Sequence, residues 1–161
     1  MFPDLSVSLR YHDVYGHNEM NNPSMIYKWL NGDSHELCEG DNNVLRDFIH
    51  ISDVTDVNVM LFEHFQKHNQ FPFNYSDVGT GRSVSLKKVG EEIAKHTKGE
   101  IKYVERKNTI QQYTEADIKE LKKAYKEIYK KDFEPLSIEK GIEKTKNDYL
   151  YHQSIKLHHL W

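Results

Sequence analysis

Arg46 is the side chain of this sequence best suited to bind a ligand. It lies in the segment EGDNNVLRDFIHISDVTDVN, residues 39–58, between an acidic, turn-forming stretch and a short apolar one. A guanidinium group presents a planar fork that binds two phosphate oxygens at once. The sequence therefore predicts that Arg46 faces a phosphate at the rim of a site. The alternative is an ion pair with Asp47 or Asp53 that only fixes the turn, since structural ion pairs imitate functional sites.

A second candidate for anion binding is the segment Gly79 to Arg82, placed where a strand meets a helix. Free N–H groups at such a junction can hold an anion. Because no third glycine completes a dinucleotide-binding pattern, we expect a tight turn instead.

Histidine and cysteine chemistry is not supported by the spacing of these residues. The chain has ten histidines, and His158 and His159 are adjacent, so their side chains point to different sides of a helix. No pair of histidines one helical turn apart with a partnering acid is present, so we expect no metal site. Cys38 has no convincing histidine partner, which argues against a nucleophilic role.

Alternating strands and helices must position these side chains. The predicted strands cover residues 5–11, 35–38, 47–51, 73–78 and 100–105. The predicted helices cover residues 25–32, 52–68, 85–99, 114–125 and 138–149. Ser52 or Asp53 is expected to cap the second helix, and Thr114 and Asp117 to frame the start of the fourth. This order predicts an α/β fold.

Size and charge narrow the function. A chain of 161 residues and 19.1 kDa is expected to form a single domain. Its formal net charge of -3 and pI near 6.4 argue against nucleic acid as a partner. No apolar stretch is long enough to cross a bilayer, so we expect no membrane insertion. One cysteine and no apolar leader favour the cytoplasm.

The order of four motifs resembles the C-terminal half of the extended short-chain dehydrogenase/reductases. These motifs are LRYHDVYG, LCEGDNNVLRDFIHISDVTDVN, DVGTGRSVSLKKV and YTEADIKEL. The resemblance is greatest to the ADP-L-glycero-D-manno-heptose 6-epimerases, to which the CEGD turn and the TEADI segment point. It implies one substrate-binding α/β domain over residues 1–161. Residues 1–16 would then be a remnant of the cofactor-binding sheet, and residues 151–161 a tail.

The resemblance implies an NADP-dependent epimerisation of an ADP-heptose, a step of lipopolysaccharide core synthesis. The family's Gly-rich cofactor turn and its Tyr-x-x-x-Lys pair have no counterpart in this sequence. Asn22 stands where the family has a second proton-transferring lysine, and an amide does not carry a proton at neutral pH. We therefore assign no catalytic residue and expect the isolated chain to be inactive, with doubtful binding of NADP.

The resemblance also implies several substrate contacts. Arg46 matches an arginine that contacts the substrate nucleotide, and the turn Cys38–Glu39–Gly40–Asp41 lies beside it. Asp13 matches a substrate-contacting asparagine, although a carboxylate disfavours an anionic ligand. Val14 matches a position that meets the cofactor. Ser24 is either a sugar-binding hydroxyl or a helix cap.

Two classes of partner remain open. The chain is either the nucleotide-sugar-binding part of such an enzyme or a non-catalytic remnant that acts as an interaction subunit. In the second case it would form a homo-oligomer or associate with a complete epimerase or with a separate N-terminal half. The unpaired strand edge expected at residues 5–11 favours association of this kind. Another sugar-nucleotide epimerase or dehydratase is a third alternative.

Overall fold

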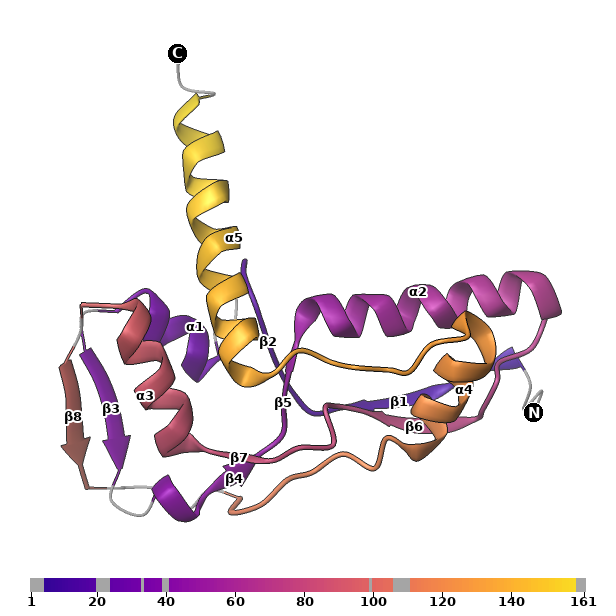
Figure 1. Cartoon of the computed structure of the whole chain (residues 1–161), viewed down its shortest axis with the longest axis horizontal. Helices are drawn as coiled ribbons and strands as arrows, with labels where there is room; N and C mark the ends of the chain where they lie inside the picture. The colour runs from indigo at the N-terminus through magenta and orange to yellow at the C-terminus, as the bar shows by residue number, and fades with distance from the viewer. Residues whose placement is uncertain are drawn as a thin grey trace.

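Short parallel strands, several of them leading into helices, form the framework of the chain (Figure 1). The computed structural model describes residues 5–19, 24–32, 34–38, 41–98, 100–105 and 111–158. The strands are β1 (Ser8–Tyr11), β2 (Asp13–Tyr15), β3 (Ser34–Cys38), β4 (Leu45–Arg46), β5 (Phe48–His50), β6 (Tyr75–Val78), β7 (Val84–Ser85) and β8 (Glu100–Val104). The helices are α1 (Met25–Leu30), α2 (Ile51–His68), α3 (Leu86–His96), α4 (Lys119–Tyr129) and α5 (Ile138–His158), with a 3-10 turn, η2 (Asp41–Asn43).

The described strands pair two by two. Ladders β1–β6, β2–β5 and β3–β8 are parallel, and β4–β7 is antiparallel. Figure 1 shows β3 and β8 with α1 and α3 at one end, and β1 and β6 with α2 and α4 at the other. Helix α5 rises between the two ends and projects away from the body. Parallel strands connected through helices are the mark of an α/β fold, so the predicted fold class is confirmed.

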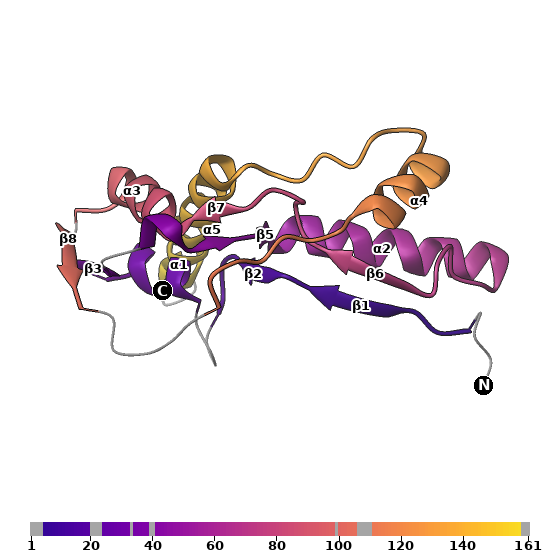
Figure 2. The ribbon, with the colours of Figure 1, turned by 90° about the horizontal axis from the view of Figure 1, so that it is seen from below.

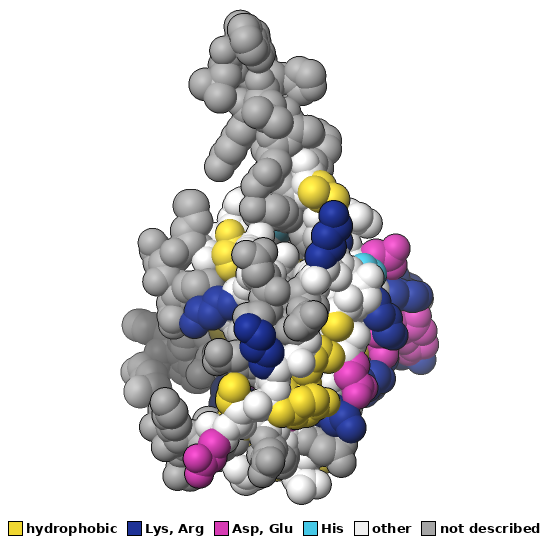
Figure 3. Space-filling view, turned by 90° about the vertical axis from the view of Figure 1, so that its left-hand side faces the viewer, with side chains coloured by type: hydrophobic (Ala, Val, Ile, Leu, Met, Phe, Trp, Pro, Cys, Tyr) yellow, Lys and Arg dark blue, Asp and Glu magenta, His cyan; other side chains and the backbone are white. Residues whose placement is uncertain are grey.

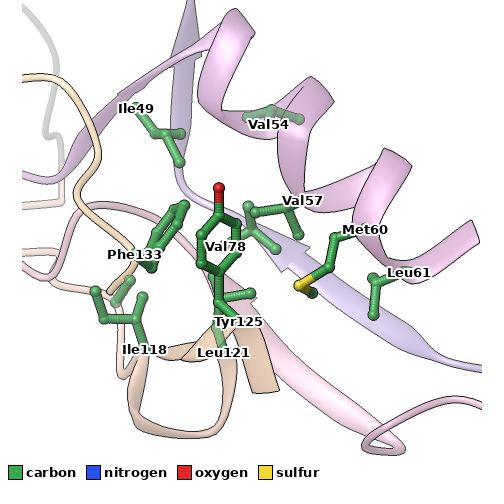
Figure 4. Close-up of a cluster of buried hydrophobic side chains, with 11 residues drawn as sticks. Ile49, Val54, Val57, Met60, Leu61, Val78, Ile118, Leu121, Tyr125 and Phe133 are labelled. Carbon is green, nitrogen blue, oxygen red and sulfur yellow. The ribbon is translucent and has the colours of Figure 1, made fainter. Parts of the chain in front are cut away.

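Each end of the molecule is held together by its own cluster of buried hydrophobic side chains. The first joins α2, α4, β5 and β6 through residues such as Val57, Val78 and Leu121, all fully buried (Figure 4). The second joins α1, α3, β3 and α5 through residues such as Ile26, Ile93 and Ile142. Burying one such side chain contributes roughly 1.5–3 kcal/mol, so each cluster holds its end of the chain.

The surface carries charges of both signs. On the face shown in Figure 3, the described lysine, arginine, aspartate and glutamate side chains are mixed, with hydrophobic patches between them. No broad field of one sign covers the described part of this face, in line with the small net charge of -3.

The helix starts differ from those expected. Helix α2 begins at Ile51, and its N-cap is His50, whose Nδ1 accepts the backbone N–H of Ser52 at 3.1 Å. The predicted caps Ser52 and Asp53 were therefore wrong, because a neutral imidazole nitrogen at the end of β5 already supplies the acceptor. Helix α4 begins only at Lys119.

The expected frame of α4 was right in part. Its N-cap is Ile118, which makes no side-chain cap hydrogen bond, but Asp117 Oδ1 accepts the amide of Lys119, the first residue of the helix, at 3.3 Å. Thr114 lies in an extended segment beside β4 instead, where its amide donates to the carbonyl of Leu45 at 2.9 Å. Helix α5 continues to His158, so the backbone of residues 151–158, expected as a tail, is helical.

Candidate functional site

Strand pairing brings three distant segments together at Arg46. Register in the β2–β5 ladder sets Asp13 beside Phe48, two residues beyond Arg46. The amide of Leu45 donates to the carbonyl of Gln112 at 2.8 Å, which places segment 111–115 along β4. The side chain of Arg46 is thus surrounded by β2 on one side and by this segment on the other.

The guanidinium of Arg46 is engaged by a carboxylate. Its Nε donates to Asp13 Oδ2 at 2.9 Å, and its Nη2 donates to Asp13 Oδ1 at 3.1 Å. Nη1 donates to the carbonyl of Gln111 at 3.3 Å. The alternative partners Asp47 and Asp53 were wrong: the ion pair is real, but its acid lies on β2. A guanidinium can hold a phosphate with the same two-pronged geometry, which Asp13 takes up here.

Two hollows meet at this ion pair. The first has a volume of about 500 Å³, and the second of about 550 Å³. Asp13, Arg46 and Gln111 line both. The first is otherwise lined by Arg10, Tyr11, His12, Tyr113, Thr114 and Glu115. The second is otherwise lined by Val14, Ser24, Met25, Phe48 and Leu86. Each hollow has the size of a small-molecule site. The first exposes polar and apolar surface about equally, whereas the second is largely apolar.

Arg10, in the first hollow, already has a partner. Its Nη2 donates to Asp77 Oδ2 at 2.7 Å, and the hydroxyl of Tyr75 donates to Asp77 Oδ1 at 2.5 Å. Burial acts to raise the pKa of the Asp77 carboxyl, but the hydrogen bonds from Arg10 and Tyr75 prevail and hold it well below its usual range. Arg46 is paired as well, but its partner Asp13 is 32% exposed, whereas Asp77 is 2% exposed and held by several donors. Arg46 is therefore the better candidate for an incoming anion in this hollow.

Asp47, next to Arg46, explains the glycine-rich turn. It is fully buried and accepts hydrogen bonds from the amide and hydroxyl of Thr80 at 2.8 and 2.6 Å. It also accepts the amides of Gly81 and Ala116 at 2.9 and 3.0 Å. Gly81 has φ +66°, a conformation that favours glycine. The N–H groups considered for anion binding are thus used internally, and the segment is a tight turn, as expected. Its expected place between a strand and a helix was wrong, because it connects β6 to β7.

Ser24 caps a helix. Its hydroxyl accepts the amide of Tyr27 at 3.1 Å at the start of α1 and donates to Glu19 Oε1 at 3.0 Å. The backbone amide of Ser24 donates to Glu19 Oε2. The capping alternative therefore describes this residue, although it also lines the second hollow. Asn22 lies outside the described residues.

The turn beside Arg46 is only partly described. The amide of Cys38 donates to Asp41 Oδ2 at 2.6 Å, so Asp41 holds the end of β3. Neither residue lines the two hollows around Arg46. Glu39 and Gly40 lie outside the described residues. Val14 lines the second hollow from β2, where it pairs with Ile49 of β5.

Sequence reasoning missed the residues that segment 111–115 contributes. Gln111 contacts Arg46, and Tyr113, 55% exposed, lines the first hollow. Both are more than sixty positions beyond Arg46, at the end of an irregular stretch. No local pattern marks them, because only strand register brings this segment to β4.

Among the described residues, no three histidine, cysteine, aspartate or glutamate side chains gather as metal ligands. In the same part of the chain, none of the helices combines the length and apolarity needed to span a bilayer.

Comparison with known proteins identifies the fold. Residues 6–74 match the sequence model of the NAD dependent epimerase/dehydratase family, a match that includes Asp13 and Arg46. Three of the solved structures that resemble this chain are those of a UDP-N-acetylglucosamine 4-epimerase, an ADP-L-glycero-D-manno-heptose-6-epimerase and a UDP-glucuronic acid 4-epimerase.

The first, from Methanobrevibacter ruminantium, is 23% identical with a TM-score of 0.69, over 91% of this chain and 46% of that one, and was solved with UDP-N-acetylmuramic acid. The second, from Helicobacter pylori, is 22% identical with a TM-score of 0.64, and the similarity covers 89% of this chain and 43% of that one. The third, from Bacillus cereus, is 22% identical with a TM-score of 0.65, and the similarity covers 91% of this chain and 45% of that one. It was solved with UDP-glucuronic acid and NAD.

These similarities establish the α/β, Rossmann-related fold of the extended short-chain dehydrogenase/reductases. The chain spans less than half the length of each of these solved proteins.

Proposed function

We propose that this chain supplies the nucleotide-sugar-binding part of an NAD(P)-dependent epimerase or dehydratase. The observation that carries the proposal is the guanidinium of Arg46, held where a hollow of mixed polarity meets a largely apolar one. A nucleotide sugar has a diphosphate between two bulky groups, which suits a cation between two hollows. The family match over residues 6–74 and the shared fold support the same function.

The ligand that we propose first is an ADP-heptose, which links the chain to lipopolysaccharide core synthesis in the cytoplasm. The support is the CEGD and TEADI motifs and the heptose epimerase among the similar structures. UDP-sugars are the alternative, because two of the similar enzymes are named for UDP-sugar substrates.

The described residues do not fit a dinucleotide cofactor. The glycine turn at residues 79–82, which connects β6 to β7, directs the amides of Thr80 and Gly81 to the carboxylate of Asp47. A second anion beside that buried carboxylate would be repelled. Among the candidate residues, Val14 alone is left for the NADP that the family resemblance implies. We therefore assign substrate binding to this chain, and we assign no catalytic step to its residues.

Isothermal titration calorimetry with ADP-heptose, a UDP-sugar and a GDP-sugar tests the proposal. We expect one of them to bind wild-type chain and the Arg46→Gln variant to bind it about 10- to 100-fold more weakly, since a charge-assisted hydrogen bond contributes about 1.5–3 kcal/mol. Lys126→Gln is the matched control, because Lys126 also loses one positive charge but pairs with Asp132 on the surface. Equal affinity in wild type and Arg46→Gln would contradict the proposal.

A second candidate function, a non-catalytic interaction subunit, is favoured by one observation. Among the described residues, β1 pairs with β6 on one edge alone. Absence of nucleotide-sugar binding together with stable association would support this alternative.

A further inference from the structure

We propose that a further hollow, between α4 and the start of α5, binds the phosphate group of a small phosphorylated molecule. This hollow has a volume of about 450 Å³, the size of a small-molecule site. It lies beside the segment that joins α4 to α5, which runs along the side of the molecule away from β1 (Figure 2). The proposal does not rest on the proposed function, because this hollow shares no lining residue with the two hollows around Arg46.

Three cationic side chains from distant parts of the chain line this hollow. Arg82 ends the glycine turn, Lys122 lies on α4 and Lys140 lies on α5. Glu134 is the one carboxylate among the lining residues, so three positive charges and one negative charge leave a net charge of +2. The whole chain has a net charge of -3, so this positive charge is a local feature. An anion is therefore the ligand that the hollow attracts.

None of these three cations has an ion-pair partner in the part of the chain that the structure describes. One turn further along each helix, by contrast, a lysine is paired. Lys126 of α4 lies 2.9 Å from Asp132, and Lys144 of α5 lies 3.0 Å from Asp148. Like charges that converge without a counterion repel one another, and a bound anion removes that repulsion.

Arg82 is fixed before any ligand arrives. Its Nη2 donates to the carbonyls of Pro135 and Leu136 at 2.6 and 3.3 Å. The amide of Leu136 donates in turn to Asp53 Oδ2 at 3.1 Å, and Asp53 itself does not line the hollow. Both hydrogen bonds of the guanidinium use one nitrogen, so Nε and Nη1 remain to donate to a phosphate. Binding therefore does not have to order this arginine first.

The rest of the lining suits a phosphate that carries an organic group. Ser137 offers a hydroxyl directly before α5, a helix of 21 residues whose N-terminal end has a positive dipole. Phe133 and Pro135 add apolar surface. A phosphate ester carries about two negative charges on one compact group at neutral pH, whereas a carboxylate carries one. The phosphate therefore matches the net charge of the hollow better.

Calorimetry with pyrophosphate tests the site, in the Arg46→Gln background so that the site at Arg46 is not counted. We expect one pyrophosphate to bind per chain, and the pair Lys122→Gln and Lys140→Gln to weaken binding at least about tenfold. The control pair, Lys123→Gln and Lys126→Gln, removes the same charge from α4 without touching the lining. All four lysines are exposed, so the variants should retain the fold, as circular dichroism will show.

Two further measurements identify the place and the chemistry. In NMR spectra, pyrophosphate should shift the amide resonances of Arg82, Lys122 and Lys140. Succinate, which carries its two charges on separate groups, should bind at least about tenfold more weakly than pyrophosphate.

Absence of pyrophosphate binding at a salt concentration of about 0.15 M overturns the proposal. So does an equal loss in the control pair, equal binding of succinate, or a set of shifted resonances elsewhere in the chain, because the anion then binds surface charge in general. With Arg46 intact, the pair Lys122→Gln and Lys140→Gln should bind a nucleotide sugar as wild type does. That result separates this site from the proposed function.

Discussion

Replacing Asp13 with asparagine should strengthen the binding of a diphosphate ligand at Arg46. Asp13 takes both prongs of the guanidinium, at 2.9 and 3.1 Å, so an incoming phosphate must displace it. The asparagine keeps the shape of the side chain and removes its charge. It also restores the residue that the family resemblance implies at this position.

The size of the effect follows from the exposure of the pair. The side chains of Arg46 and Asp13 are 22% and 32% exposed, so the pair is partly screened by water and contributes about 1 kcal/mol at most. Removing Asp13 also removes its repulsion of a phosphate about 4 Å away, which is worth about 1 kcal/mol in water. Together these terms give about 1–2 kcal/mol, or binding about 5- to 30-fold tighter.

Calorimetry with the nucleotide sugar, and with pyrophosphate as the minimal probe, measures this difference. Asp132→Asn is the control, because it removes the same charge from a carboxylate that pairs with Lys126 on the surface. In the Arg46→Gln background, Asp13→Asn should give a smaller gain, since the displaced pair no longer exists. If Asp13→Asn binds the probes no better than wild type does, the ion pair does not compete with the ligand and the reasoning is refuted.

Three further predictions concern stability. Burial lowers the pKa of His50 to about 4. Between pH 6.5 and 4 the unfolded chain therefore binds more protons than the folded one, and the free energy of unfolding should fall by up to about 3 kcal/mol as the pH is lowered through this range. His50→Asn, which retains a cap acceptor, should flatten that loss in denaturant titrations across this pH range, and an unchanged loss would exclude His50 as its source. Asp47→Ala leaves the buried donors of its turn unpaired and should cost roughly 3 kcal/mol or more, measured as a lower denaturation midpoint; a midpoint within error of wild type would contradict this. Gly141→Ala sets a methyl group 1.8 Å from the Tyr15 hydroxyl and should cost about 1–3 kcal/mol, and adding Tyr15→Phe should recover part of the lost Tm.

Helices could be predicted because their signals are local. Val54, Val57 and Leu61 recur at helical spacing and form the buried stripe of α2. The start of this helix was misplaced because a histidine caps it, and histidine is not among the usual capping residues. Helix periodicity therefore identified the element, while its first residue depended on the environment of His50.

The partner of Arg46 could not be predicted for the opposite reason. Asp13 is 33 positions away, and the two meet only because β2 pairs with β5 in one register. The sequence suggested Asp47 or Asp53 as the ion-pair partner of Arg46, since both are near it along the chain. In an extended segment, however, neighbouring side chains point to opposite sides, so Asp47 faces the interior when Arg46 faces the hollows.

Because the side chains of Arg46 and Asp47 point to opposite sides, Asp47 can fix the direction of Arg46 without touching its guanidinium. Asp47 fixes the backbone at its position through four hydrogen bonds to the turn at Thr80 and Gly81 and to Ala116. That anchor sets the direction of Arg46 independently of what its guanidinium binds. The ion pair with Asp13 is partly exposed and weak, whereas the anchor is buried and strong. A nucleotide sugar that binds as we propose therefore has to displace only the weaker contact, and the direction of Arg46 is retained when Asp13 moves aside.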